Sequence, residues 1–231
     1  MRRETANVLL LLVGGALLKI TLNGTYLRYV KPTAKPWVLA AGVVMVGLAV
    51  VAIVLDVVGR HRHVDGHQHS GRWVWLLMLP VLAIFLVVPP ALGADSVLRA
   101  GNRAAPAVSR TFPPLPRGTV VPIGMSDFIT RGVWDSSGSL SGRTVALTGF
   151  VVHGNGIVYV ARLVITCCAA DATPMKVALT GGQADRLPDD QWIQVDGMLR
   201  PGSATEANGY TPTVVVSALA IADAPADPYE Y

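Results

Sequence analysis

The chain has 231 residues, of which 52% are hydrophobic and 15% are charged, so it is too apolar for an average soluble domain. Residues 1–98 carry nine lysines and arginines against four acids, whereas residues 99–231 carry ten against eleven. The basic excess therefore lies in the apolar half, where such residues flank membrane spans and meet anionic headgroups. The near-neutral second half gives no indication of nucleic-acid binding.

Three apolar stretches predict transmembrane helices over about 5–26, 37–58 and 73–92. The first is imperfect, because two arginines and a short apolar run also fit a signal peptide, although no small-residue cleavage site follows cleanly. Lys19 lies near one end of this span, where it either snorkels to the interface or faces a partner helix as an intramembrane cation. In the second span, Gly42 and Gly47 offer small surfaces for close helix contact.

A histidine-rich loop over 59–72 separates the second and third spans, and four of the five histidines of the chain fall within nine of its residues. Neutral imidazole is a good ligand for zinc, copper and nickel, so the loop predicts a metal-binding tract. Its candidate ligands are His61, His63, Asp65, His67 and His69. The alternative is a solvated connector that protonates as the pH falls through the histidine range.

The composition and the periodicity change after the third span. Residues 93–118 predict a linker rich in alanine and proline, and 125–134 predict a short helix with Ser126 as its N-cap. Alternating apolar residues then predict five strands, over 143–152 (with a bulge at Gly149), 157–166, 175–180, 191–199 and 211–219. Five short antiparallel strands with glycine kinks predict a small OB-like β-barrel. The expected fold class is thus a membrane protein with a transmembrane region over 1–92 and an all-β domain over 119–231.

The only two cysteines, Cys167 and Cys168, stand side by side at the end of the strand expected over 157–166. Successive side chains of a strand point to opposite faces, so the two thiols diverge unless the strand ends there. The residues up to Asp171 predict such an end, and a turn could bring both thiols and this carboxylate to one point as metal ligands. The alternative is a pair of small buried hydrophobic residues. A disulfide between adjacent residues would require strained geometry.

Several short segments, taken in this order, resemble the YcgQ-like family of bacterial membrane proteins. They are 147–151, Arg162 followed by 168–171, 192–197 and the terminal 227–231. The resemblance covers nearly the whole length and implies one subunit of a two-component membrane permease, paired with a separate multi-span permease and linked to zinc supply or acid tolerance. The histidine loop is short and lacks cysteines that are found among members of the family, and Cys167 stands where histidine can stand in the family.

An accessory permease subunit that handles a divalent transition metal such as zinc is therefore the predicted function. The alternative is a structural or pH-responsive membrane partner without bound metal. We do not expect an enzyme, because His153 is the only histidine of the β domain and no acid is placed by the sequence to orient it. With the N-terminus inside, five lysines and arginines flank the spans on the cytoplasmic side and six on the outer side, so their number does not decide the orientation. The two arginines before the first span favour a cytoplasmic N-terminus, and hence a multi-pass protein of the cell membrane with an extracytoplasmic β domain.

Overall fold

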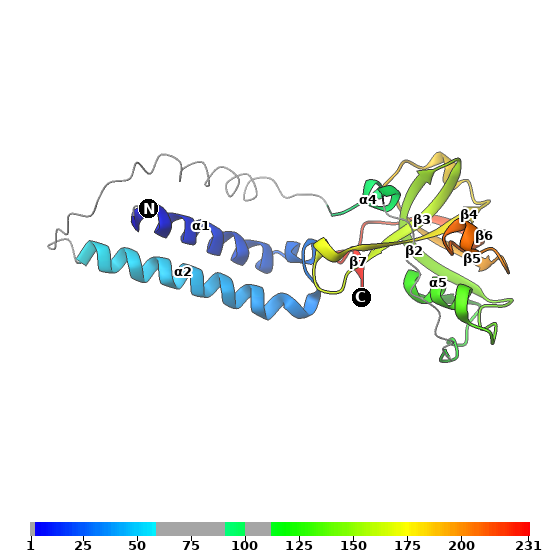
Figure 1. The fold of residues 1–231 in the computed structure, drawn as a ribbon, viewed down its shortest axis with the longest axis horizontal. Helices are drawn as coiled ribbons and strands as arrows, with labels where there is room; N and C mark the ends of the chain where they lie inside the picture. Colours follow the sequence, from blue (N-terminus) through cyan, green and yellow to red (C-terminus); the bar gives the residue numbers. More distant parts are fainter. Residues whose placement is uncertain (1–2, 59–90, 100–111) are drawn as a thin grey trace. The chain divides into compact units, whose positions relative to one another are not determined.

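The structure, a computed structural model, describes residues 3–58, 91–99 and 112–231 (Figure 1). The chain divides into two compact units, residues 1–90 and 91–231. The histidine loop over 59–72, with all five of its candidate ligands, and nearly all of the third predicted span lie outside the described residues.

In the part of the first unit that the structure describes, two helices lie side by side, α1 (Arg3–Leu22) and α2 (Lys35–Val58), joined by two short 3-10 turns (Figure 1). The helices meet where Gly14 faces Gly42: a Cβ built on Gly42 would lie 2.9 Å from a methyl carbon of Leu18 and 3.2 Å from the Gly14 carbonyl oxygen. Two glycines let the backbones approach this closely because neither carries a side chain. Gly47, in contrast, has open space around it. Lys19 is in the last turn of α1 with an exposed side chain, a position that suits snorkelling.

The prediction of three membrane spans needs correction within the described residues. There, one helical segment, Pro32–Val58, is long and apolar enough to cross a membrane, and it contains the predicted second span. The apolar part of α1, Ala6–Leu22, is shorter than such a span, because the helix ends four residues before the predicted limit at Tyr26. Gly24, in the left-handed region at φ 81°, then leads into the 3-10 turn Thr25–Arg28.

The described residues of the second unit form a seven-stranded mixed sheet and two α-helices. The helices are α4 (Ala94–Arg99) and α5 (Met125–Trp134). The strands are β1 (Val120–Pro122), β2 (Thr144–Gly154), β3 (Ile157–Val164), β4 (Thr173–Thr180), β5 (Trp192–Leu199), β6 (Thr213–Ile221) and β7 (Tyr229–Glu230). All five predicted strands form. They were predicted from the alternation of apolar residues. In the first part of β2 this alternation corresponds to half-buried and buried positions in turn.

The strand pairings run around a ring: β2 pairs with β3, β3 with β4, β4 with β6, β6 with β5, and β5 with β2. The sheet is mixed rather than wholly antiparallel as predicted, since β1–β2, β4–β6 and β3–β7 are parallel pairs. Strand β2 passes from β5 to β3 near Gly149, where a Cβ would lie 2.4 Å from the carbonyl oxygen of Ala161. The irregular register is in β5 opposite β6, between Asp196 and Gly197, and not at Gly149 as predicted.

Three further details differ from the sequence-based expectation. Strands β1 and β7 have three and two residues, too few for any alternation to be seen. The N-cap of α5 is Gly124 rather than Ser126, and its first backbone N–H groups are satisfied by a distant side chain, described below. The predicted linker contains α4, whose Val97 is fully buried against the sheet.

Two apolar clusters hold this unit together. In the first, α5 contributes Met125, Phe128 and Ile129, at helical spacing, to buried residues from β2, β3, β4, β5 and β6. In the second, α4 covers a neighbouring set that includes Phe150, Leu163, Ile165 and Tyr229. Residues 150–152 of β2 are therefore buried on both faces, and the end of β3 is fixed by the second cluster just before the two cysteines.

Candidate metal centre

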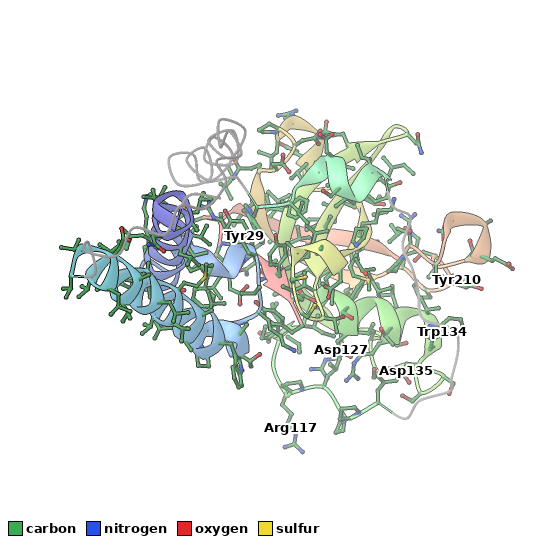
Figure 2. All side chains as sticks on the ribbon, turned by 60° about the vertical axis from the view of Figure 1, so that its left-hand side comes forward. Tyr29, Arg117, Asp127, Trp134, Asp135 and Tyr210 are labelled. Carbon is green, nitrogen blue, oxygen red and sulfur yellow. The ribbon has the colours of Figure 1, made fainter. Side chains whose placement is uncertain are left out.

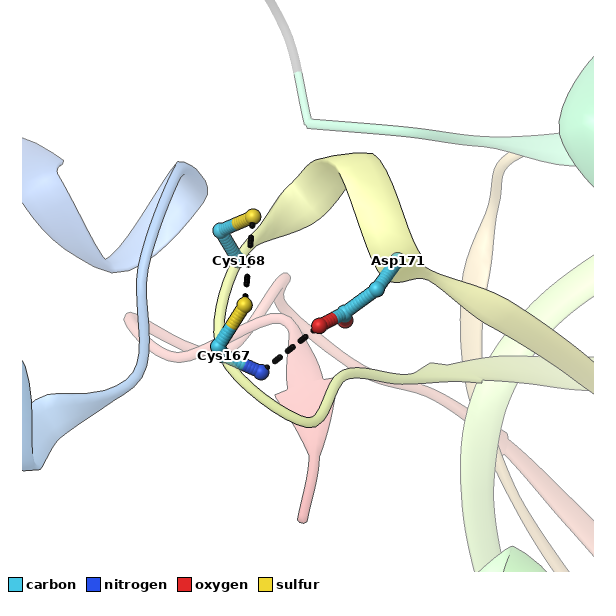
Figure 3. A group of neighbouring side chains, drawn as sticks. All are labelled: Cys167, Cys168 and Asp171. Atoms are coloured by element: carbon cyan, nitrogen blue, oxygen red, sulfur yellow. Dashed lines mark hydrogen bonds between the residues drawn. The ribbon is translucent and has the colours of Figure 1, made fainter.

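The turn between β3 and β4 brings the two thiols and a carboxylate together (Figure 3). Strand β3 ends at Val164, and a single 3-10 turn, Ala169–Asp171, reverses the chain before β4. The ligand atoms of Cys167, Cys168 and Asp171 all lie within 4.8 Å of one another, and the two Sγ atoms are 3.5 Å apart. The strand end that the sequence predicted thus prevents the thiols from diverging, and among the described residues these three form the cluster.

The carboxylate of Asp171 organises this turn. Its Oδ1 accepts the backbone N–H of Thr166 at 2.9 Å and its Oδ2 accepts that of Cys167 at 2.8 Å. In return, the backbone N–H of Asp171 donates to the Cys168 carbonyl at 3.1 Å. A hydrogen bond from the Cys167 side chain, followed by that of the Thr166 backbone, lowers the pKa of Asp171 to about 2, so the group is ionised at physiological pH.

The same carboxylate acts in the opposite direction on the neighbouring thiol. Its hydrogen bond with the Cys167 side chain, and then the contact with Cys168, raise the pKa of Cys167 to about 11. Cys167 is exposed and Cys168 is half-buried, so solvent reaches the site. Their exposure argues against the alternative that both cysteines are core residues. A bound cation would reverse the electrostatics at Cys167, because a coordinating thiol is held as its thiolate.

The spacing of the donor atoms fits a four-coordinate ion. With Zn–S bonds of about 2.3 Å, two sulfurs 3.5 Å apart subtend about 100° at the metal, close to the tetrahedral angle of about 109°. A linear two-coordinate ion would instead require the sulfurs on opposite sides of the metal. Ligand atoms around tetrahedral zinc are about 3.6–3.8 Å apart, so the widest separation in the cluster has to close by about 1 Å. An ion would replace the hydrogen bond between the Cys167 thiol and the Asp171 carboxylate, which leaves the carboxylate a lone pair for it.

The histidine of the β domain lies in a separate pair. His153 Nδ1 is 2.8 Å from Asp189 Oδ1, which also accepts the His153 backbone N–H at 2.8 Å. The side-chain hydrogen bond with His153 is the main reason that the pKa of Asp189 is lowered. The sequence placed no acid beside His153, and the structure brings Asp189 there. The two residues are 36 positions apart, on β2 and in the turn before β5, so no local pattern could reveal the pair.

Comparison with known proteins shows what the region that carries the cluster is similar to. Residues 130–231 match the family model of the DUF1980 C-terminal domain. The matched region includes the second half of α5 and all strands from β2 to β7, and therefore Cys167, Cys168 and Asp171. The match supports the resemblance seen in the sequence at the level of this domain, while the YcgQ-like assignment and the permease role go beyond it. No curated protein and no solved structure matches the chain.

Proposed function

We propose that this chain is a membrane-anchored accessory subunit of a two-component membrane permease whose DUF1980 domain handles a divalent transition metal, with zinc as the first candidate. The observation that carries the proposal is the solvent-accessible cluster of two thiols and one carboxylate at the end of β3. Thiolate and carboxylate are both zinc ligands, and their spacing suits tetrahedral coordination.

Three ligands leave one position of a tetrahedral ion open. Structural zinc sites are closed by four protein ligands, whereas sites that exchange a ligand keep a position for water or an incoming group. The exposure of Cys167 suits transfer of the metal to or from a partner. A role in enzyme catalysis is less well supported, because a thiol with a pKa of about 11 is a poor nucleophile at neutral pH.

The fold proposed for the DUF1980 domain is an OB-like barrel. The closed order β2-β3-β4-β6-β5 supports it, since five strands joined in a ring make a small Greek-key barrel. The helix α5 fills one part of its interior with Phe128. OB-like barrels present loops on a rigid support, which suits a ligand cluster on a turn between two strands.

Membrane attachment is supported by the apolar segment Pro32–Val58, whose side chains are largely exposed over 43–58. In this proposal the lipid bilayer and a multi-span permease subunit cover that surface. The histidine loop over 59–72 serves as a second, weaker place of metal capture next to the membrane.

The second candidate function is a structural or pH-responsive membrane partner without metal. It is favoured by one observation: both carboxylate oxygens of Asp171 already accept backbone hydrogen bonds, so the turn is stable without an ion. In that case the cysteines have no ligand role.

Zinc stoichiometry of the purified full-length protein separates these functions. We expect the unmodified protein to bind zinc and Cys168→Ser or Asp171→Asn to lose the ion of the DUF1980 domain. Asp185→Asn removes an exposed carboxylate from another turn of the same domain and should change nothing. Replacement of His61, His63, His67 and His69 by alanine should remove only the ions held by the loop. If Cys168→Ser leaves the stoichiometry unchanged in this histidine-free protein, the second candidate function is favoured.

A further inference from the structure

The C-terminal strand lies directly beside the end of β3. Strand β7 pairs with β3 in parallel, with Tyr229 opposite Leu163 and Glu230 opposite Val164. The backbone N–H of the next residue, Ile165, donates to the Glu230 carbonyl at 2.9 Å. Ile165 and Tyr229 are both buried in the second apolar cluster.

The hydrogen bonds of β7 and those of Asp171 follow one another along the chain without a gap. Ile165 bonds to the C-terminal strand, and the next two residues, Thr166 and Cys167, bond to Asp171. The cysteine turn therefore starts from a backbone that β7 holds in place. A shift of β7 moves the point from which both thiols project.

The side chain of Glu230 ties this strand to α5. Its Oε1 accepts the backbone N–H of Met125 at 2.9 Å, and its Oε2 accepts that of Ser126 at 3.1 Å. These are two of the first N–H groups of α5, which have no partner within the helix, and a carboxylate there also opposes the positive end of the helix dipole. The cap comes from a residue more than a hundred positions away.

Arg162, on β3, also contacts the C-terminal strand. Its Nη2 donates to the carbonyl oxygens of Asp227 and Tyr229, at 3.2 and 3.3 Å, and its guanidinium lies over the ring of Trp192. Its Nε lies 3.9 Å from Glu230 Oε1 and is buried without a hydrogen bond among the described residues. A buried donor of this kind is costly, so the nearby carboxylate matters as its countercharge.

We propose that Glu230 is a positioning residue for the metal centre, joining α5, Arg162 and the cysteine turn through β7. The inference rests on the proposed function and concerns a residue that touches neither the thiols nor the metal. Glu230 fixes β7 by its side chain, and β7 fixes the last residues before Thr166 by its backbone. Removing the carboxylate frees the turn and widens the range of Sγ positions.

Zinc affinity of the full-length protein, in which the four loop histidines are replaced by alanine, tests this role. Supporting residues around a metal centre typically contribute 10- to 100-fold in affinity, so Glu230→Ala should weaken zinc binding by about tenfold or more. Glu230→Gln keeps one acceptor oxygen for α5 and should lose less. Glu206→Ala, an exposed acid in another turn, is the matched control with the same change of charge. All affinities are measured well below the unfolding temperature of each variant.

Amide hydrogen exchange gives a second measurement that needs no metal. In Glu230→Ala, exchange over residues 163–168 should rise while exchange over 192–197, in β5, stays as in the unmodified protein. In the unmodified protein, the Ile165 and Cys167 amides should exchange through one common opening. If the unmodified protein binds no zinc, the proposed function fails. Hydrogen exchange then decides by itself whether Glu230 holds the cysteine turn in place through β7. Unchanged exchange over 163–168, or a zinc affinity of Glu230→Ala within twofold of the starting protein, overturns it.

Discussion

Asp171 Oδ2 accepts the backbone N–H of Cys167 at 2.8 Å, and the same carboxylate raises the pKa of that residue's thiol to about 11. One acid thus both builds the turn and keeps its first thiol protonated. A cation placed between them would be held by the carboxylate and would stabilise the thiolate. The Cys167 thiol is therefore protonated without a cation and would be a thiolate with one bound.

Zinc should slow the alkylation of both cysteines in the full-length protein with the loop histidines replaced. Cys168→Ser should abolish this protection at Cys167, because the remaining thiol and carboxylate bind the ion weakly. Cys167→Ser should reduce the protection at Cys168 less, since the family resemblance is firmer at Cys168. A labelling time course with mass spectrometry, with and without zinc, gives the rates. Equal rates in both conditions contradict a metal centre here.

Zinc affinity should rise with pH in the same histidine-free protein. Ligation requires the thiolate, and Cys167 has a pKa of about 11, so each binding event releases its proton throughout the range from pH 6 to 8. This thiol alone predicts about a tenfold gain in affinity for each pH unit. Asp171, with a pKa lowered to about 2, stays ionised and adds no slope. Competition with a chelator of known pH dependence measures the slope, and a flat profile contradicts ligation by Cys167.

Gly42→Ala should loosen the packing of α1 against α2. The added Cβ would lie 2.9 Å from a Leu18 methyl carbon and 3.2 Å from the Gly14 carbonyl oxygen, so the helices must separate. Overpacking of this kind costs about 1–3 kcal/mol. Gly47→Ala is the control, because a Cβ there meets no atom within 4 Å. Thermal unfolding in detergent, followed by circular dichroism, should show a loss for Gly42→Ala alone; equal curves for both variants would mean that the two helices do not pack at Gly42.

Arg131→Met should destabilise the β domain by about 1–3 kcal/mol, since loss of the buried guanidinium leaves its hydrogen-bonding partners unpaired. Arg131 is buried; its guanidinium binds Asp127 at 2.9 Å and the Pro113 carbonyl at 2.9 Å, and it lies over the Phe112 ring. The exposed Arg117, which points away from the domain in Figure 2, supplies the control Arg117→Met. Denaturant unfolding followed by tryptophan fluorescence measures both. Similar midpoints for the two variants would show that Arg131 does not anchor residues 112–116.

A reporter fused after Tyr231 should behave as exported. This outcome follows from a cytoplasmic N-terminus, which the two arginines at the start of the chain favour, together with the odd number of spans predicted from the sequence. Paired reporters active on opposite sides of the membrane measure it. Cytoplasmic activity of the fusion would require either another orientation or an even number of spans.

The sequence alone determined the elements whose signal is local and repeated. Alternation along residues 143–152, 157–166 and 191–199 predicted the main strands, because over part of each strand one face is buried while the other is less so. The helix Met125–Trp134 was predicted with its limits, since Met125, Phe128 and Ile129 recur at helical spacing. The cluster of Cys167, Cys168 and Asp171 was also predictable, because all three residues lie within five positions and need only one turn to meet.

Only the tertiary structure decided the contacts between residues far apart in the chain. The cap of α5 by Glu230, the pairing of His153 with Asp189, and the strands β1 and β7 depend on the closure of the sheet, which no short window of sequence contains. Short strands carry too few residues to show a period, and a charged residue in a polar segment does not indicate its partner. The first predicted span differs from the helix in the structure for a related reason. Apolar composition indicates which residues are compatible with a lipid bilayer, whereas the chain reversal at Gly24 ends α1 at Leu22.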